Sequence, residues 1–349
     1  STLFPYTTLF RSRTGAPMGR EHFPVEGRRI WVCGHRGMVG SALLRRLRGE
    51  KCGLPTADRR ALDLRNQADV QAWLKKTRPD AVIVAAAKVG GIHANSQYPV
   101  AFLAENLAIA QNVIGGAAET GVQRLIFLAS SCIYPRQAPQ PIREDSLLAG
   151  PLEPTNQWYA VAKIAGLKLT EAYWQERGLD YFTAIPANLY GPGDNFDPLT
   201  SHVIPALTRR MHEAALNGFP EISIWGSGAP TREFMHVDDC ADALVHLLKN
   251  YAEPGPINIG VGSEVSIRAL AETLAAVTGY QGRLAFDAAK PDGMPRKSLD
   301  GTRLAATGWR GGRPLREGLE GAYRYFLDHI AETSPARPEL KAVASHHHD

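Results

Sequence analysis

The sequence has few cysteines, and their spacing suggests neither a disulfide framework nor a metal site. Only four occur among 349 residues, and they are scattered at Cys33, Cys52, Cys132 and Cys240. Metal sites and small disulfide-rich folds need cysteines at short, regular spacings. We therefore expect free thiols, a reducing cytoplasmic environment and no bound metal.

The chain also lacks internal repeats, low-complexity linkers and any uncharged apolar run long enough to cross a membrane. Its net charge is only +4, and no basic helix with interleaved aromatic residues is present, so nucleic acid is not an expected partner. Apolar residues make up 44% of the chain and charged residues 21%, which are ordinary values for a globular protein. The length predicts a main domain with a smaller lobe.

The two ends lack the patterns that specify a fold. Residues 1–17 carry arginines but no acidic residue, a composition shared with organelle transit peptides, yet without a clear amphipathic period. We interpret this stretch as artefactual, ahead of a natural start near Met18, and His346–His348 as a tag remnant. Residues 1–27 and 331–349 are accordingly predicted to be tails.

What the chain does have is an alternation of strand-like and helix-like segments. The strand-like runs are RRIWVCG, PDAVIVAAA, RLIFLAS, YFTAIPAN and PINIG, and a further strand near KCGLPT (residues 51–56) is poorly patterned. This order predicts an α/β fold with a doubly wound parallel-sheet Rossmann domain. We assign residues 28–190 and returning segments near 234–261 to that domain. Residues 191–233 and 262–330 are assigned to a smaller mixed α/β substrate lobe.

A glycine-rich loop joins the first strand to the helix that follows it. Its glycines are spaced three apart, and glycine permits a tight turn and a close approach of backbone to pyrophosphate. Such a loop can serve packing alone, but a strand before it and a helix after it are the context that a dinucleotide site requires. The loop residues that we expect at the cofactor are Gly34, Arg36, Gly37, Met38, Val39 and Gly40.

The segments FLASSCIYP and YAVAK provide the reactive groups of a nicotinamide-dependent site. The first is predicted as a buried strand, Leu125–Ala129, that ends in Ser130, Ser131 and Cys132. The second is predicted as a helix on which Tyr159 and Lys163 share a face. Because an ammonium near a phenol favours the phenolate, we expect Lys163 to make Tyr159 a better proton donor and acceptor. Such pairs are usually part of a solvated helix face, but the strand-end serine and the glycine loop favour catalysis.

The choice between NAD and NADP depends on residues beyond the second strand. NAD enzymes place an acid there for the ribose diol, whereas NADP enzymes place arginines for the 2′-phosphate. Arg36 lies in the glycine loop, and Arg59 and Arg60 follow the weakly patterned strand. Asp58 is the competing feature.

Taken together, these motifs resemble the extended short-chain dehydrogenase/reductase family. The resemblance runs from about Arg29 to Leu327 and is carried by GHRGMVGSA, AAAKVGGIHAN, SSCIYP, EPTNQWYAVAKIAG, NLYGPGDNF, SHVIPAL, WGSG, REFMHVDD and KPDGMPRK. The glycine loop and YxxxK are common to the superfamily, so SSC and SHVIPAL are the specific part. They resemble members that epimerise C3 and C5 of a GDP-linked 4-keto-6-deoxyhexose and then reduce C4 with NADPH.

The resemblance implies the catalytic roles. Cys132 and His202 are implied to be the acid and base of the epimerisations, and Tyr159 the proton donor in ketone reduction. Ser130 is implied to bind the carbonyl or enolate oxygen, and Lys163 the nicotinamide ribose as well. The alternatives remain that Cys132 is a small buried apolar residue and that His202 caps a helix.

The resemblance also implies the binding residues and partners. It places Arg36 and Arg59 at the 2′-phosphate, which favours NADP(H), with further cofactor contacts at Asp63, Leu64, Leu128, Ser130, Ser131, Lys163, Pro186, Asn188, Leu189 and His202. Substrate contacts are implied at Arg210, Trp225, Arg232 and Asp292, although Trp225 has an alternative as lobe core and Asp292 as a turn residue. Because the family pairs subunits through long helices, the expected partners are a GDP-sugar and a second copy of the chain.

Other functions remain open. A 4,6-dehydratase of the same superfamily would carry an Asp-Glu pair where this chain has Ser131 and Cys132. A 4-epimerase has no need of the Cys132 and His202 pair. A nicotinamide-sensing regulatory protein typically lacks the YxxxK pair, which is intact here.

Overall fold

The computed structural model describes residues 23–331 except 199 and 291. Most of the two predicted tails, including Met18 and the C-terminal histidines, lies outside the described residues. The N-terminal tail prediction is nevertheless too long, because Phe23 and Val25 are buried in the main core. The Phe23 ring packs under the guanidinium groups of Arg28 and Arg124, at 5.4 and 5.2 Å. Two isolated apolar residues have no periodicity by which the sequence could reveal this packing.

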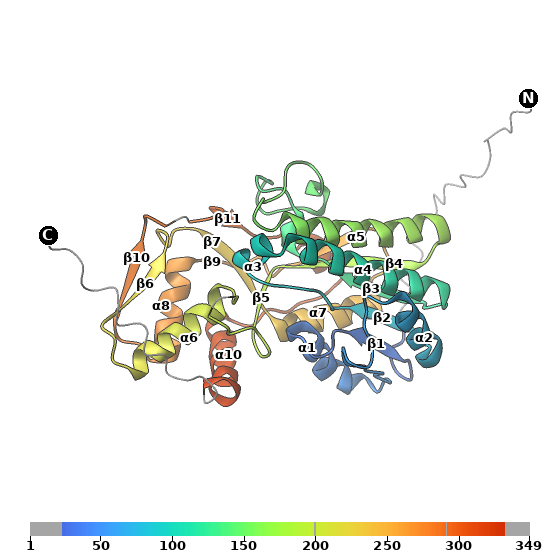
Figure 1. Ribbon diagram of the computed structural model, residues 1–349, viewed down its shortest axis with the longest axis horizontal. Coiled ribbons are helices and arrows are strands. Elements are labelled where there is room, and N and C mark those ends of the chain that lie inside the picture. Colours follow the sequence, from blue (N-terminus) through green and yellow to red (C-terminus); the bar gives the residue numbers. More distant parts are fainter. Residues whose placement is uncertain (1–22, 199, 291, 332–349) are drawn as a thin grey trace, which may run out of the picture.

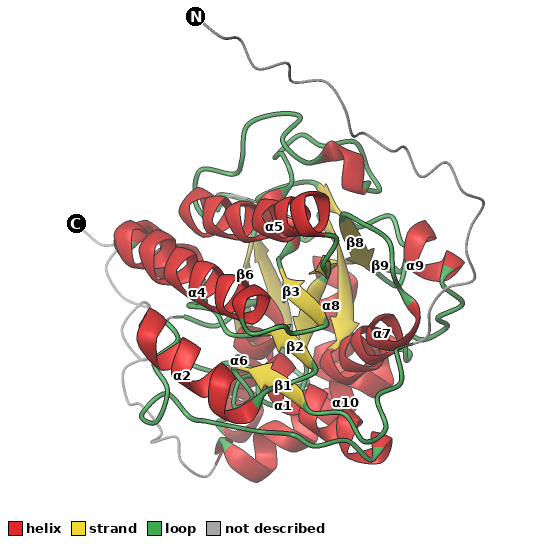
Figure 2. Cartoon of the chain, turned by 90° about the vertical axis from the view of Figure 1, so that its right-hand side faces the viewer, coloured by secondary structure: helices red, strands yellow, loops and turns green. Residues whose placement is uncertain are grey.

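A parallel sheet of five strands forms the centre of the larger part of the molecule (Figures 1 and 2). Its order is β1 (Ile30–Cys33), β2 (Ala81–Val84), β3 (Arg124–Leu128), β4 (Asp180–Pro186) and β8 (Pro256–Ile259). Almost every residue of these strands is buried, which explains why the strands read as continuous apolar runs rather than alternating ones. The predicted α/β fold with a parallel central sheet is confirmed.

Helices cover both faces of this sheet (Figure 2). On one face α1 (Met38–Leu47) packs against α7 (Val237–Asn250). On the other, α4 (Pro99–Glu119) packs between α2 (Gln67–Thr77) and α5 (Gln157–Arg177). This two-sided cover is the doubly wound arrangement.

The weakly patterned strand near residues 51–56 does not form, so that prediction was wrong. The chain there makes only an isolated parallel bridge between Gly53 and Arg29. Lys51 has a left-handed backbone with φ of 52°, and Pro55 has no N–H to donate to a strand neighbour. These two residues interrupt the extended conformation on either side of Gly53.

The smaller part of the molecule has short strands and its own apolar core (Figure 1). Strand β6 (Glu221–Trp225) pairs with β10 (Arg283–Asp287), and β7 (Thr231–His236) pairs with β5 (Asn188–Tyr190), β9 (Glu264–Ser266) and β11 (Arg296–Lys297). The helices of this part are α6 (Val203–Leu216), α8 (Ile267–Thr278) and α10 (Leu315–His329). Two short helices, α3 (Ile92–Gln97) and α9 (Thr302–Ala306), lie in the connections.

A buried carboxylate on β7 joins the two parts. Glu233 has no exposed surface and accepts N–H bonds from Val261 at 2.5 Å, Gly262 at 2.9 Å and Leu299 at 2.8 Å. Val261 and Gly262 follow the last strand of the main sheet, and Leu299 follows β11. Glu233 therefore fixes β7 and β11 relative to the sheet.

By length and composition, α4 is the one helix among the described residues that matches a membrane span. Glu105 lies within it and pairs with Lys88 at 2.9 Å. The helix packs against α2 and α5 over the sheet. That packing accounts for its apolar character.

Candidate active site

The predicted reactive hydroxyl and thiol follow β3 at its carboxyl end. Ser130 has an extended backbone, and its hydroxyl accepts the N–H of Cys132 at 3.5 Å. Residues Ser131–Ile133 form a single 3₁₀ turn, in which Cys132 is buried. The turn directs the chain away from the sheet edge and leaves these side chains at the end of the strand.

Helix α5 brings Tyr159 and Lys163 to the same place. It approaches β3 closely because Gly166 faces Phe127, where an added Cβ would meet the ring at 2.4 Å. The Lys163 ammonium donates to the carbonyl of Leu128 at 2.8 Å and lies 5.7 Å from the centre of the Tyr159 ring. The predicted shared face is therefore present, and it faces the end of β3.

Protonation of this pair differs from the sequence prediction. Burial lowers the pKa of Lys163 to about 8 and raises the pKa of Tyr159 above its usual value. The expectation that Lys163 favours the phenolate is not met, because burial rather than the charge of Lys163 sets the direction of the shift in the pKa of Tyr159. The ammonium donates to the Leu128 carbonyl and not to the phenol, and a buried phenol that receives no hydrogen bond from a cation keeps its proton.

The predicted acid–base pair also starts in neutral form. Burial raises the pKa of the Cys132 thiol, an effect that the cations of Lys297 and Lys163 partly offset. His202 immediately precedes α6, but its side chain makes no capping hydrogen bond, so the alternative of a helix-capping histidine is not observed. The residue is exposed overall, yet partial desolvation of the imidazole, followed by the charge of Lys297, lowers the pKa of His202. Both side chains therefore interact electrostatically with Lys297.

The glycine loop has the shape of a phosphate cradle. Gly34 has φ of 80°, and an added Cβ there would lie 2.7 Å from Cα of Ala86. A Cβ on Gly40 would lie 2.1 Å from the Gly34 carbonyl oxygen, so neither position accepts a side chain. Helix α1 begins after Gly37 with no side-chain cap and no acidic residue in its first turn. Its free N–H groups fit the pyrophosphate of a dinucleotide.

The residues predicted at the 2′-phosphate form an exposed cluster beside this loop. Arg36 pairs with Asp58 at 3.1 Å, and Arg59 lies 3.7 Å from Glu105. Both arginine side chains are 73% exposed, so a phosphate can compete for them with their carboxylate partners. Asp58, the feature that favoured NAD, accepts N–H bonds from residues 60 and 61 at 3.0 Å each. Its carboxylate is therefore occupied by its own turn and by Arg36.

The remaining cofactor candidates lie along the same edge of the sheet. Leu128 and Ser131 are at the end of β3, and Pro186 ends β4. Asn188 begins β5, and its amide donates to the Glu233 carbonyl at 3.0 Å. The carboxyl ends of parallel strands share one edge, so these positions lie on the side of the glycine loop. Two further candidates, Asp63 and Leu64, are held by local contacts. Asp63 pairs with Arg65 at 2.7 Å, and the Leu64 carbonyl accepts a hydrogen bond from Asn112 at 3.0 Å.

The four predicted substrate residues gather around β6 and β7. Arg210 of α6 donates to the carbonyl of Ser223 on β6, and Trp225 at the end of that strand is 68% exposed. Asp292 accepts from the N–H and hydroxyl of Ser227 at 2.6 and 2.8 Å, so it does act as a turn residue. Arg232 on β7 lies near enough to Asp292 to feel its charge.

Partial burial lowers the pKa of both Arg210 and Arg232. These guanidinium groups have lost part of their hydration without a strong anionic partner. Two such cations, one on α6 and one on β7, suit a diphosphate, since each planar fork can pair with two oxygens.

A cavity of about 60 Å³ lies beside Cys132, and sequence reasoning missed part of its lining. The residues around it are Ser131, Cys132, Tyr134, Pro135, Arg136, Ile142, Glu153, Asn156, Met294 and Lys297. Asn156 precedes α5, and Lys297 lies on a strand of two residues. A strand so short has no periodicity, and no motif marks Lys297, so only the fold places it here.

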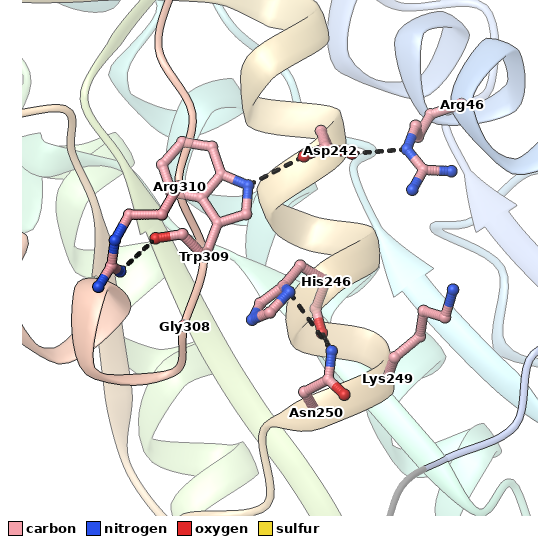
Figure 3. Close-up of a pocket in the computed structure, with 8 residues that line it drawn as sticks. All are labelled: Arg46, Asp242, His246, Lys249, Asn250, Gly308, Trp309 and Arg310. Atoms are coloured by element: carbon pink, nitrogen blue, oxygen red, sulfur yellow. Dashed lines mark hydrogen bonds and ion pairs between the residues drawn. The ribbon is translucent and has the colours of Figure 1, made fainter.

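A larger hollow of about 510 Å³ lies elsewhere, between α7, α1 and the segment after α9 (Figure 3). Its polar groups satisfy one another: Asp242 accepts from Arg46 at 2.7 Å and from the Trp309 indole at 3.0 Å. None of the predicted site residues lines it. We therefore place the candidate active site at the sheet edge. Among the described residues no group of His, Cys, Asp and Glu side chains is arranged to hold a metal ion.

Known proteins that are similar to this chain in sequence and in fold point to one family. The profile of the NAD dependent epimerase/dehydratase family matches residues 30–260. A GDP-L-fucose synthase of Sinorhizobium fredii (strain NBRC 101917 / NGR234) is 53% identical over 308 residues, 88% of this chain and 98% of that protein. GDP-L-fucose synthase 1 of Arabidopsis thaliana is 52% identical over 303 residues, 86% of this chain and 94% of that one. The solved structure of a GDP-L-fucose synthetase from Naegleria fowleri bound to NADP matches with a TM-score of 0.80 at 28% identity, covering 87% of this chain and 95% of that one.

The buried ammonium of Lys163 predicts a specific pH dependence of stability. Its pKa is about 8 in the folded chain and about 10.4 in an unfolded one, so between these values the unfolded chain holds a proton that the folded chain has released. Stability then rises with pH. Relative to Lys163→Met, the unaltered chain should gain up to about 1.4 kcal/mol of unfolding free energy per pH unit across this window, measured by urea denaturation. Lys168 is an exposed lysine on the same helix, and the difference in unfolding free energy between the unaltered chain and Lys168→Met should not depend on pH. If the difference for Lys163→Met were also independent of pH, the assignment would be contradicted.

Proposed function

This chain belongs to the NAD dependent epimerase/dehydratase family and, within it, to the GDP-L-fucose synthases, and we propose that it converts GDP-4-keto-6-deoxy-D-mannose to GDP-L-fucose. The reaction is epimerisation at C3 and C5 followed by NADPH-dependent reduction at C4. The observation that carries the proposal is the thiol of Cys132 beside the Ser130, Tyr159 and Lys163 side chains. A simple 4-epimerase has no use for that thiol, and a 4,6-dehydratase would have acids in its place.

The proposed cofactor site is the cradle of the glycine loop with the exposed cluster beside it. Bound NADPH supplies the hydride for C4. The N–H groups at the start of α1 hold the pyrophosphate, and Arg36 and Arg59 hold the 2′-phosphate. The fit rests on the absence of space for side chains at Gly34 and Gly40.

We assign the epimerisations to Cys132 and His202. The C4 ketone acidifies the protons on C3 and C5, so inversion needs a base on one face of the ring and an acid on the other. A thiol and an imidazole are suited to both roles near neutral pH. Ser130 donates its hydroxyl proton toward the C4 oxygen, where charge develops in the enolate.

We assign the reduction to Tyr159 and Lys163. The raised pKa of Tyr159 keeps its proton available, and the phenol gives that proton to the C4 oxygen when the ketone is reduced. The Lys163 ammonium, already held by the Leu128 carbonyl, lies where the nicotinamide ribose is expected. Ser130 thus serves both half-reactions, because both place negative charge on the same oxygen.

The sugar nucleotide is assigned to the smaller part of the molecule. Arg210 and Arg232 are proposed to bind the diphosphate, Trp225 to contact the nucleotide, and Asp292 to bind it while also holding the Ser227 turn. This keeps the predicted division of the chain, with residues 28–190 and about 234–261 for the cofactor. Residues 191–233 and 262–330 then serve the substrate.

We also propose a homodimer in which α4 and α5 meet their counterparts in a four-helix contact. The two helices lie side by side on the outer face of the sheet (Figures 1 and 2). Large apolar side chains remain exposed at this face and its rim, among them Val100 at 76%, Tyr98 at 56% and Trp158 at 42%. A second copy of the chain would cover them.

A cytoplasmic location fits the four free cysteines, three of which are buried. The proposed chemistry uses no metal, and the proposed partners are a GDP-sugar and a second subunit.

The most direct functional test incubates the protein with NADPH and GDP-4-keto-6-deoxymannose in heavy water. We expect GDP-L-fucose carrying deuterium at C3 and C5, identified by NMR. Cys132→Ser should slow that exchange at least about tenfold, because a hydroxyl is a far weaker acid than a thiol, and should release an unepimerised 6-deoxyhexose nucleotide. Tyr159→Phe should suppress NADPH oxidation while some exchange continues. Exchange at the unaltered rate in Cys132→Ser would make Cys132 structural and the proposed mechanism wrong.

The cofactor assignment predicts a selective effect of Arg59. Arg59→Ala should raise the KM for NADPH roughly tenfold or more, because a hydrogen bond to a charged group contributes about 1.5–3 kcal/mol. The KM for NADH should barely change, since NADH has no 2′-phosphate. Arg60→Ala is the matched control, with an adjacent arginine removed and no loss expected. Equal use of NADPH and NADH by the unaltered enzyme would contradict this account.

The proposed dimer predicts the mass in solution. Sedimentation at micromolar concentration should give twice the chain mass of 38.0 kDa. Val100→Arg should shift the chain toward monomer, because it places a charge in the proposed contact. Leu216→Arg, at an equally exposed apolar position on α6, should leave the mass unchanged. A monomer mass for the unaltered chain would rule the dimer out.

A further inference from the structure

Lys297 is a cation of the active site for which the proposed chemistry has no role. It lies on β11 opposite Arg232 of β7. Its side chain lines the cavity of about 60 Å³ that Cys132 also lines. The residue as a whole is partly exposed, but its ammonium end is enclosed by protein, and this desolvation lowers the pKa of Lys297.

In the described part of the chain the side chain of Lys297 has neither a hydrogen bond nor an ion pair. The one carboxylate that lines the cavity, Glu153, pairs with Arg136 at 3.3 Å and accepts from the Thr155 hydroxyl at 3.2 Å. By contrast, the other buried active-site lysine, Lys163, is held by the Leu128 carbonyl. An enclosed ammonium without a partner is unfavourable, so an anion that forms nearby during the reaction would relieve it.

The groups that face Lys297 come from four different parts of the fold. They are Cys132 after β3, His202 before α6, Arg232 on β7 and Glu153 ahead of α5. Cys132 and Lys297 stabilise each other's charged forms, and for Cys132 the effect of Lys297 exceeds that of Lys163. Arg232 is a second cation and cannot pair with Lys297. The thiol is therefore the group beside Lys297 that can become an anion in the reaction.

We propose that Lys297 is a positioning residue that stabilises the thiolate of Cys132 during epimerisation. The inference rests on the proposed function, within which it gives the two buried lysines separate tasks. Lys163 serves the reduction beside Tyr159, and Lys297 serves proton transfer at carbon beside Cys132.

The charge movements balance in both directions. When the Cys132 thiolate takes a proton from C3 or C5, the C–H electron pair becomes the C–C double bond of the enolate. Negative charge then passes from sulfur to the C4 oxygen. In the opposite direction, His202 takes the proton from the other face of the ring and the Cys132 thiol gives its proton to carbon, so that the negative charge is left on sulfur. Lys297 keeps its protons throughout and acts only by lying beside the sulfur that carries the charge.

The first test measures the pH dependence of Cys132 alkylation by iodoacetamide, followed by mass spectrometry of the Cys132 peptide. Lys297→Met should move the midpoint upward by about one pH unit, which slows alkylation about tenfold below the midpoint. Lys297→Arg retains the charge and should restore the midpoint to within a few tenths of a unit. Lys76→Met, which removes an exposed lysine on α2, is the matched control, and Cys52 is an internal reference thiol in each sample.

The second test measures deuterium exchange at C3 and C5 together with the KM for the GDP-sugar. Lys297→Met should slow exchange about tenfold while the KM and the NADPH dissociation constant stay within twofold. An unchanged alkylation midpoint would overturn the proposal. A raised KM for the GDP-sugar together with an unchanged alkylation midpoint would also overturn it, because Lys297 would then bind the diphosphate. Lys297→Gln provides the same test if the Met variant is unstable.

The outcomes also separate this inference from the proposed function. A shifted midpoint in a protein that makes no GDP-L-fucose would leave the link between Lys297 and Cys132 intact and reject the function. Formation of GDP-L-fucose with an unshifted midpoint would reject the role of Lys297 alone.

Discussion

The site depends on one contact, in which the Lys163 ammonium donates to the Leu128 carbonyl at the end of β3. A buried ammonium without a hydrogen-bond acceptor is unfavourable, so this bond helps to hold α5 against the strand. The close approach that it needs is possible because Gly166 has no side chain against Phe127. As a result, Tyr159 lies beside the Ser130–Cys132 turn, and the phenol, hydroxyl and thiol that we propose as reactive groups share one edge of the sheet.

The protonation states show which kind of charge the site is arranged to receive. The thiol, the imidazole and the phenol are all neutral near pH 7, while Arg210, Arg232 and Lys297 are partly or wholly desolvated cations. Such a site favours negatively charged groups. In the proposed reaction these groups are the phosphates of the ligands and the enolate oxygen or thiolate that forms. Glu233, by tying β7 and β11 to the main sheet, sets the positions of Arg232 and Lys297 relative to Cys132.

Sequence reasoning was most successful where a pattern is local and repeated. The apolar runs, the glycine loop and the spacing of Tyr159 and Lys163 predicted the parallel sheet, the cradle and the shared helix face. It failed at residues 51–56, where Lys51 and Pro55 prevent a strand, and at Phe23 and Val25, whose burial no period reveals. The direction of the Lys163 ammonium and the placement of Lys297 on a two-residue strand depend on contacts between segments far apart in the chain. Such contacts leave no mark on the neighbouring sequence.

The central claim is that one site, built from both parts of the chain, performs both half-reactions on a single bound sugar. A crystal structure of the protein with NADP⁺ and GDP-L-fucose tests it most directly. The account predicts Cys132 and His202 on opposite faces of the hexose ring, the Tyr159 hydroxyl within hydrogen-bonding reach of O4 at about 3 Å, and the diphosphate on Arg210 and Arg232. A hexose ring bound away from Cys132, or with Cys132 and His202 on the same face, would contradict it.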